Sequence, residues 1–310
     1  MTTSTSSLPR RVRLVEVGPR DGLQNEKAMV PTETKVAFIG LLADAGLTAI
    51  EATSFVSPKW VPQMSDAADV MTRIDRRPGV VYSVLVPNMQ GFERALAAKA
   101  DEVVVFGAAS EAFSQRNINC GIAESIERFR PVAAAAIKAG MRVRGAISCA
   151  LGCPYQGEVT PESVGLVARL MRDIGVEHVG VADTIGVGTP GRTQRALEAA
   201  LAVYPLEDVS GHFHDTYGQA LANIYACLEI GVATFDTSSA GLGGCPYAKG
   251  ATGNVATEDV VYQLHGLGIE TGIDLGRLRA AGRFISDALG RPTASRVARA
   301  LAAADPEVVR

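Results

Sequence analysis

The sequence is organised around Gly211-His212-Phe213-His214-Asp215, where an apolar-leaning run ends and a helix-patterned segment opens at Thr216. Side chains alternate in direction along a β-strand, so His212 and His214 point to one side and Phe213 to the other. Two imidazoles about 6 to 7 Å apart on one strand face can share a metal ion. A hydrogen-bonded histidine pair is the alternative interpretation. Only four histidines occur in the chain, and two stand at this junction, which favours the metal.

Composition indicates a well-packed globular protein that could hold one large domain or two medium ones. The 310 residues are 47% hydrophobic and 20% charged, and the net charge is −3. The largest basic block is Arg10-Arg11-Val12-Arg13, which argues against a nucleic-acid partner. No apolar run approaches the roughly 18 residues of a membrane span. The polar first seven residues and five cysteines without a CxxC pair favour a cytoplasmic location.

Short runs, mostly rich in Val and Ile and bounded by turn-forming residues, predict eight buried parallel strands. They cover residues 12–17, 49–53, 80–86, 102–106, 142–148, 178–182, 209–214 and 233–237. Helical patterns lie between them, for example at 35–45, 164–174, 193–203 and 216–230.

Eight strand–helix alternations predict a (β/α)8 TIM barrel, which usually needs about 250 residues. A doubly wound open sheet is the rival architecture, but no Gly-x-Gly-x-x-Gly follows the first strand. Segments 275–289 and 293–304 predict appended C-terminal helices. We therefore expect one catalytic domain with a helical extension from about residue 258.

The barrel predicts that function gathers beyond the C-terminal ends of its strands. Polar motifs do follow those ends, at 20–25, 51–54, 183–184, 212–214 and 241–254. On these motifs the chain resembles the 3-hydroxy-3-methylglutaryl-CoA lyase family, from about Arg13 to about Arg296. The matching segments are GPRDGLQNE at 18–26, EATSFVSP at 51–58, NINC at 117–120, DTIG at 183–186, HFHD at 212–215 and the glycine-rich loop 240–248.

Some of these motifs are more specific than others. The Arg-Asp-Gly and His-x-His pieces are shared with related metal-dependent synthases, whereas the loop that carries Cys245 is more specific to the lyases. One departure is Gly290-Arg291-Pro292, where animal relatives carry an Asn-Arg-Lys stretch that helps to form the acyl-CoA site.

The resemblance implies that Asp21, His212, His214 and Asn254 hold one divalent cation. One carboxylate, two imidazoles and one amide oxygen form a mixed set that suits Mg²⁺ or Mn²⁺. Catalytic zinc takes fewer protein ligands, and no thiolate is demanded here.

The implied reaction is metal-dependent retro-Claisen cleavage of 3-hydroxy-3-methylglutaryl-CoA to acetyl-CoA and acetoacetate. Arg20 is expected to meet the developing enolate oxygen, and either Asp21 or His212 to act as general base. Cys245 is expected to protonate the enolate. Glu51 and Asp183 are expected to orient Arg20 or bind substrate.

An acyl-CoA thioester is thus the expected substrate, and a homodimer or higher homo-oligomer the expected assembly. Three alternatives remain open: a synthase that condenses acetyl-CoA with a 2-oxo acid, a lyase for a larger 3-hydroxy-3-alkylglutaryl-CoA, and a non-catalytic metal-binding barrel.

Overall fold

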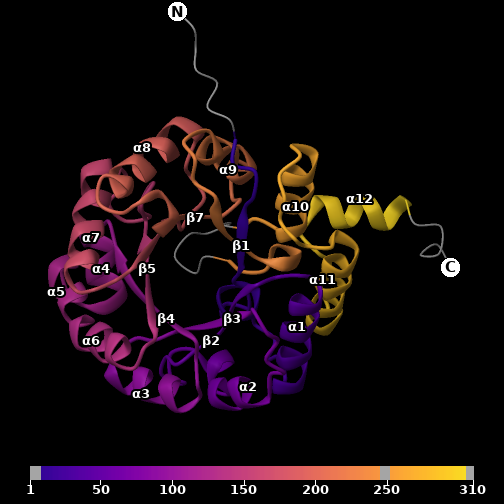
Figure 1. The fold of residues 1–310 in the computed structure, drawn as a ribbon, viewed down its shortest axis with the longest axis horizontal. Helices are drawn as coiled ribbons and strands as arrows, with labels where there is room; N and C mark the ends of the chain where they lie inside the picture. Colours follow the sequence, from indigo (N-terminus) through magenta and orange to yellow (C-terminus); the bar gives the residue numbers. More distant parts are fainter. Residues whose placement is uncertain (1–7, 245–251, 305–310) are drawn as a thin grey trace, which may run out of the picture.

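The computed structural model describes residues 8–244 and 252–304. Within these ranges eight parallel strands pair in sequence order, and β8 pairs with β1, so the sheet closes into a barrel (Figure 1). The strands are β1 Arg13–Glu16, β2 Ala49–Ser54, β3 Val81–Leu85, β4 Glu102–Ala108, β5 Arg142–Ser148, β6 His178–Asp183, β7 Val209–Phe213 and β8 Thr234–Thr237. The predicted barrel is confirmed, and closure rules out the open sheet.

Helices surround the strands as an outer ring (Figure 1). In chain order the α-helices of the described ranges, including the C-terminal α11 and α12, are α1 Thr32–Asp44, α2 Ala67–Arg73, α3 Met89–Ala97, α4 Glu111–Ile118, α5 Ile122–Glu127, α6 Arg130–Lys138, α7 Pro161–Asp173, α8 Pro190–Leu201, α9 Ala220–Glu229, α10 Thr257–Gly266, α11 Leu275–Leu289 and α12 Arg296–Ala304. Helices α7 and α8 begin at Pro161 and Pro190, just before the predicted apolar patterns at 164–174 and 193–203, because a proline suits the first helical position. Every helix in the described ranges is too short or too polar to cross a membrane.

The helix predicted from residue 216 begins only at Ala220, because a turn precedes it. Gly218 adopts φ +68 and donates its N–H to the Asp215 carbonyl oxygen at 3.0 Å. The Asp215 side chain accepts the Ala220 N–H at 3.0 Å. A turn therefore separates the His-x-His strand from α9, because Asp and Gly favour turns and caps over helix interiors.

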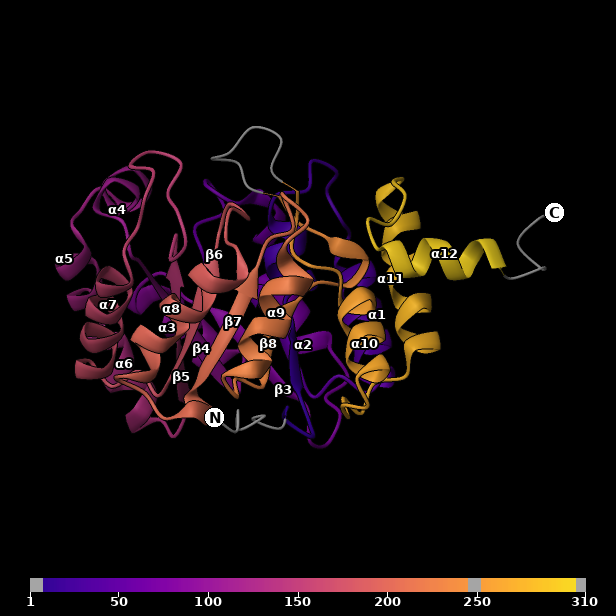
Figure 2. The same cartoon turned by 90° about the horizontal axis from the view of Figure 1, so that it is seen from above.

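The C-terminal helices extend one side of the barrel. Helix α11 lies along α1, whereas α12 projects outward (Figures 1 and 2). The start of α12 is held by Asp259 of α10, whose carboxylate accepts the N–H groups of Arg296 and Val297 at 3.1 and 2.9 Å. These bonds satisfy donors that the first helical turn leaves unpaired.

Candidate metal and active site

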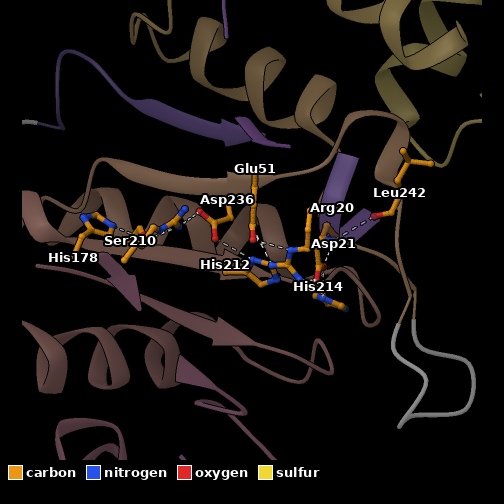
Figure 3. Close-up of polar contacts among 11 residues, drawn as sticks. Arg20, Asp21, Glu51, His178, Ser210, His212, His214, Asp236 and Leu242 are labelled. Atoms are coloured by element: carbon orange, nitrogen blue, oxygen red, sulfur yellow. Dashed lines mark hydrogen bonds and ion pairs between the residues drawn. The ribbon is translucent and has the colours of Figure 1, made fainter. Parts of the chain in front are cut away.

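Three of the four predicted metal ligands, Asp21, His212 and His214, lie close together (Figure 3). Asp21 lies in η1, the π-helical turn Gly18–Gly22 that follows β1. His212 lies near the end of β7, and His214 follows its last residue. The potential ligand atoms of Asp21, His212 and His214 all lie within 4.8 Å of one another. Strand period and barrel geometry thus bring an oxygen ligand and two nitrogen ligands to one point.

Asn254 completes this group from the other side. It forms an isolated bridge with His214, and its Nδ2 donates to Asp21 Oδ2 at 2.8 Å and to the Leu242 carbonyl oxygen at 3.3 Å. Its Oδ1 is buried and has no hydrogen-bond partner within the part of the chain that the structure describes. A buried acceptor without a donor is costly, so this oxygen fits a bound cation.

Protonation states also suit a cation. Burial alone would raise the pKa of Asp21, but the charge of Arg20, helped by that of His212, lowers it to about 2. Burial and then the positive charge of His212 lower the pKa of His214 to about 4. An ionised carboxylate and a neutral imidazole are the forms that bind metal ions.

Burial would lower the pKa of His212, but the hydrogen bond to Asp236 and the charges of Asp236 and Asp21 raise it, so His212 must lose a proton to bind a metal ion. Asp21, His214 and Asn254 fit the divalent cation implied by the sequence without such a change.

Arg20 is held by two carboxylates. Its Nε and Nη2 donate to Glu51 Oε1 and Oε2 at 2.8 and 3.0 Å, and its Nη1 donates to Asp21 Oδ1 at 2.7 Å. Burial would lower the pKa of Arg20, but the charges of Glu51 and Asp21 outweigh burial and raise it. The two-pronged bond fixes the guanidinium plane, and its remaining N–H groups can serve another oxygen. Glu51 therefore lies where it can orient Arg20.

Asp183 occupies a different environment. Its fully buried carboxylate accepts the backbone N–H groups of Val187 and Gly188 at 3.1 and 2.7 Å. Burial outweighs these bonds and raises its pKa to about 6. The structure thus brings Asp183 to the turn after β6, which its side chain orders, and not into contact with Arg20.

Sequence reasoning missed Glu16, which is fully buried at the end of β1. Its carboxylate accepts from Gly18 N and Ser239 N at 2.8 and 2.9 Å, and from Thr257 Oγ1 at 2.7 Å. These partners flank the segments that carry Asp21 and Asn254. An acidic residue in a predicted buried strand was the available signal, because a carboxylate is buried only with donors around it.

A second buried carboxyl group, Glu258, predicts an unusual pH dependence of stability. Both of its oxygens lie 3.0 Å from the Ala240 backbone nitrogen. Burial, opposed by backbone hydrogen bonds and reinforced by the charge of Glu16, raises its pKa to about 8. Between its unfolded pKa of about 4.3 and that value, the folded state binds more protons than the unfolded state. The contribution of Glu258 to stability is thus fully present below the unfolded pKa and is lost as pH rises.

We expect Glu258→Gln to be more stable than the wild type near pH 8, because the amide needs no proton. At about 1.4 kcal/mol per pKa unit, the difference in the free energy of unfolding should reach a few kcal/mol, and it should vanish near pH 4. Urea unfolding of both proteins across this pH range measures it. Parallel pH curves would contradict the prediction.

A cavity of about 840 Å³ opens over the site. Arg20, Asp21 and both histidines line one part of it. Its apolar wall includes Val56, Val61, Leu85, Val104, Phe106 and Phe113. Cys245 lies outside the described residues, but its neighbour in the sequence, Gly244, also lines the cavity. This volume suits a small organic substrate with an apolar part and a polar, cation-binding part.

Fold and site together define a (β/α)8-barrel enzyme whose cavity is built around a candidate metal centre. Within that class, the chain belongs to the HMGL-like family, whose profile matches residues 11–285. The family predicted from the sequence motifs is thereby confirmed.

Individual relatives and a solved structure support the same family. The chain is 59% identical to the 3-hydroxy-3-isohexenylglutaryl-CoA/hydroxy-methylglutaryl-CoA lyase of Pseudomonas aeruginosa, over 96% of this chain and 99% of the relative. It is 57% identical to the mitochondrial hydroxymethylglutaryl-CoA lyase of Rattus norvegicus, over 96% and 92%. A crystal structure of hydroxymethylglutaryl-CoA lyase from Pseudomonas aeruginosa, 59% identical, matches with a TM-score of 0.94 over 96% of this chain and 99% of that one.

Proposed function

We propose that this protein cleaves 3-hydroxy-3-methylglutaryl-CoA to acetyl-CoA and acetoacetate, as a carbon–carbon lyase that depends on a divalent cation. The observation that carries the proposal is the approach of Asp21, His212, His214 and Asn254 to one another beside Arg20. Arg20, Asp21 and both histidines line one cavity. The relatives named as lyases of this substrate, at 57% and 59% identity, support the same activity.

Mg²⁺ or Mn²⁺ is the cation we propose, held by Asp21, His212, His214 and Asn254. Oxygen and imidazole ligands in this ratio suit these ions better than zinc. When bound, the cation would acidify the substrate 3-hydroxyl group and neutralise charge on substrate oxygens.

The remaining steps belong to side chains of the chain. Asp21 or His212 takes the proton of the 3-hydroxyl group, and the bond between C2 and C3 breaks as the C3 carbonyl forms. The electron pair moves onto the thioester carbonyl as an enolate. Arg20, fixed by Glu51, donates to that enolate oxygen. Cys245 then protonates C2, which releases acetyl-CoA.

Loss of the Cys245 thiol should affect catalysis far more than loss of the Cys227 thiol. Cys245→Ala should lower kcat by roughly 10²-fold, because a general acid typically contributes at least this much. Cys227→Ala should change kcat little, because Cys227 is fully buried in α9, where burial raises the pKa of its thiol. Steady-state kinetics measure both. A near-normal kcat in Cys245→Ala would show that the proton donor lies elsewhere.

A product assay on a panel of 3-hydroxyacyl-CoA thioesters, with Mg²⁺ present, tests the proposed function. The panel should contain the 3-methyl substrate and an analogue with a long 3-alkyl chain. Acetyl-CoA release from the 3-methyl substrate is expected. Failure to cleave any 3-hydroxy-3-alkylglutaryl thioester would refute the lyase assignment.

A lyase for a larger 3-alkyl substrate is the second candidate. The apolar wall that includes Leu85, Val104 and Phe106 favours it, since each buried CH₂ contributes about 0.8 kcal/mol of binding. A higher kcat/KM for the long-chain analogue than for the 3-methyl substrate would select this candidate.

We further propose one catalytic domain, with α10 to α12 as its helical extension, that works in the cytoplasm as a homodimer or larger homo-oligomer. The start of α10 at Thr257 supports a boundary near residue 258. Light scattering of the purified protein measures the oligomeric state.

A further inference from the structure

A line of polar side chains runs through the barrel interior to the metal ligands (Figure 3). His178 Nε2 lies 3.0 Å from Ser210 Oγ, and Arg144 Nη2 lies 3.3 Å from the same oxygen. Arg144 Nη2 also pairs with Asp236 Oδ1. The line ends where Asp236 Oδ2 lies 3.2 Å from His212 Nδ1. Asp236 is thus the link between the barrel interior and a metal ligand.

We propose that Asp236 is a positioning residue that holds His212 with its proton on Nδ1, which leaves Nε2 to bind the cation. With both ring nitrogens engaged in this way, His212 cannot take the substrate proton, so Asp21 is the general base. The proposal rests on the metal site of the proposed function. His212 and Asp236 lie directly opposite each other on the adjacent strands β7 and β8. A carboxylate that accepts from one ring nitrogen fixes both the tautomer and the ring orientation of a metal-binding histidine.

Arg144 gives this carboxylate its fixed orientation. Asp236 is 7% exposed, and its two oxygens are divided between two partners, with Arg144 on one and His212 on the other. The same nitrogen, Arg144 Nη2, also donates to Ser210 Oγ at 3.3 Å, which adds a second bond to the guanidinium. Asp236 Oδ2 therefore stays opposite His212 Nδ1, so Nδ1 must carry a proton and donate to it.

A purely structural role is the alternative, in which the Arg144–Asp236 pair only balances buried charge. Asp236→Asn separates the two roles. Arg144 would still claim the side-chain oxygen, so the amide NH₂ would face His212 Nδ1 and require an acceptor there. His212 would then carry its proton on Nε2, the nitrogen needed for the cation.

Two measurements on the full chain test this inference. The first is ¹⁵N NMR of histidine-labelled protein, which is tractable because the chain has four histidines. Wild-type His212 should be in the Nδ1–H form when Mg²⁺ is bound. It should be in the same form without Mg²⁺ at a pH where the ring is neutral. Asp236→Asn should convert the cation-free ring to the Nε2–H form. Calorimetric titration with Mn²⁺ should show affinity reduced roughly 10- to 100-fold.

His178→Gln is the matched control. His178 is buried at the far end of the same line and contacts Ser210, so its loss disturbs the same interior. Its Mn²⁺ affinity should stay near the wild-type value. An equal loss of affinity in His178→Gln and Asp236→Asn would overturn the inference, and so would an unchanged His212 tautomer in Asp236→Asn.

A second variant guards against misfolding caused by the unpaired Arg144. Asp236→Asn combined with Arg144→Met removes the buried ion pair as a whole, which is better tolerated than loss of one partner. Without Arg144, the amide can turn its oxygen toward His212, so Mn²⁺ affinity should recover toward the wild-type value. Affinity in the double variant that stays roughly 10-fold or more below the wild-type value would contradict the positioning role. If even the wild type binds no divalent cation, the proposed function itself fails.

Discussion

Chelation of divalent cations is expected to abolish lyase activity, and Mg²⁺ or Mn²⁺ to restore it. The reason is the donor set: an ionised Asp21, a neutral His214, and a buried Asn254 Oδ1 without a partner among the described residues. Removing a ligand should have a similar effect. Because a catalytic cation supplies several kcal/mol of transition-state stabilisation, His214→Ala should lower kcat on the order of 10³-fold.

His265→Ala is the matched control for the metal prediction. His265 is exposed at the end of α10 and bonds to Thr271 Oγ1 at 3.0 Å, away from the site. Its loss should leave both kcat and the Mg²⁺ dependence unchanged. Circular dichroism should show that His214→Ala remains folded. Full turnover in a sample shown by elemental analysis to be metal-free would contradict this prediction.

Arg20→Gln is expected to lower kcat by roughly 10² to 10³-fold with a modest change in KM. A donor aimed at the developing enolate acts mainly in the transition state, and losing one such donor typically costs this much. Arg20→Lys should recover little, because an ammonium group cannot reproduce the two-pronged bond to Glu51. Glu51→Gln should share part of the kcat defect, because the Glu51 carboxylate orients the guanidinium.

Arg73→Gln is the matched control, since Arg73 pairs with Glu33 on the exposed surface and should not affect kcat. Mn²⁺ affinity should stay near the wild-type value in Arg20→Gln, which would distinguish Arg20 from the ligand Asp21. Steady-state kinetics and calorimetry provide both readouts. A raised KM with an intact kcat would mean that Arg20 only anchors substrate.

Apolar periodicity in the sequence predicted the bounds of some strands and helices correctly. Strand β5 at Arg142–Ser148 and helix α11 at Leu275–Leu289 have the predicted bounds. The start of α9 was predicted too early, because Asp215 and Gly218 form a turn that apolar periodicity does not reveal. Patterns of apolar residues report burial, whereas the exact end of a helix depends on side-chain caps.

By itself, the sequence determined the barrel, through eight apolar runs separated by helical patterns. It also predicted the candidate ligands Asp21, His212, His214 and Asn254, through the family resemblance of its motifs. Only the tertiary structure decided which partners hold these groups. Strand period tells which face a side chain occupies, but the register between strands decides what lies opposite. The pairing of β7 with β8 therefore sets Asp236 against His212, and the bend of η1 brings Arg20 to Glu51.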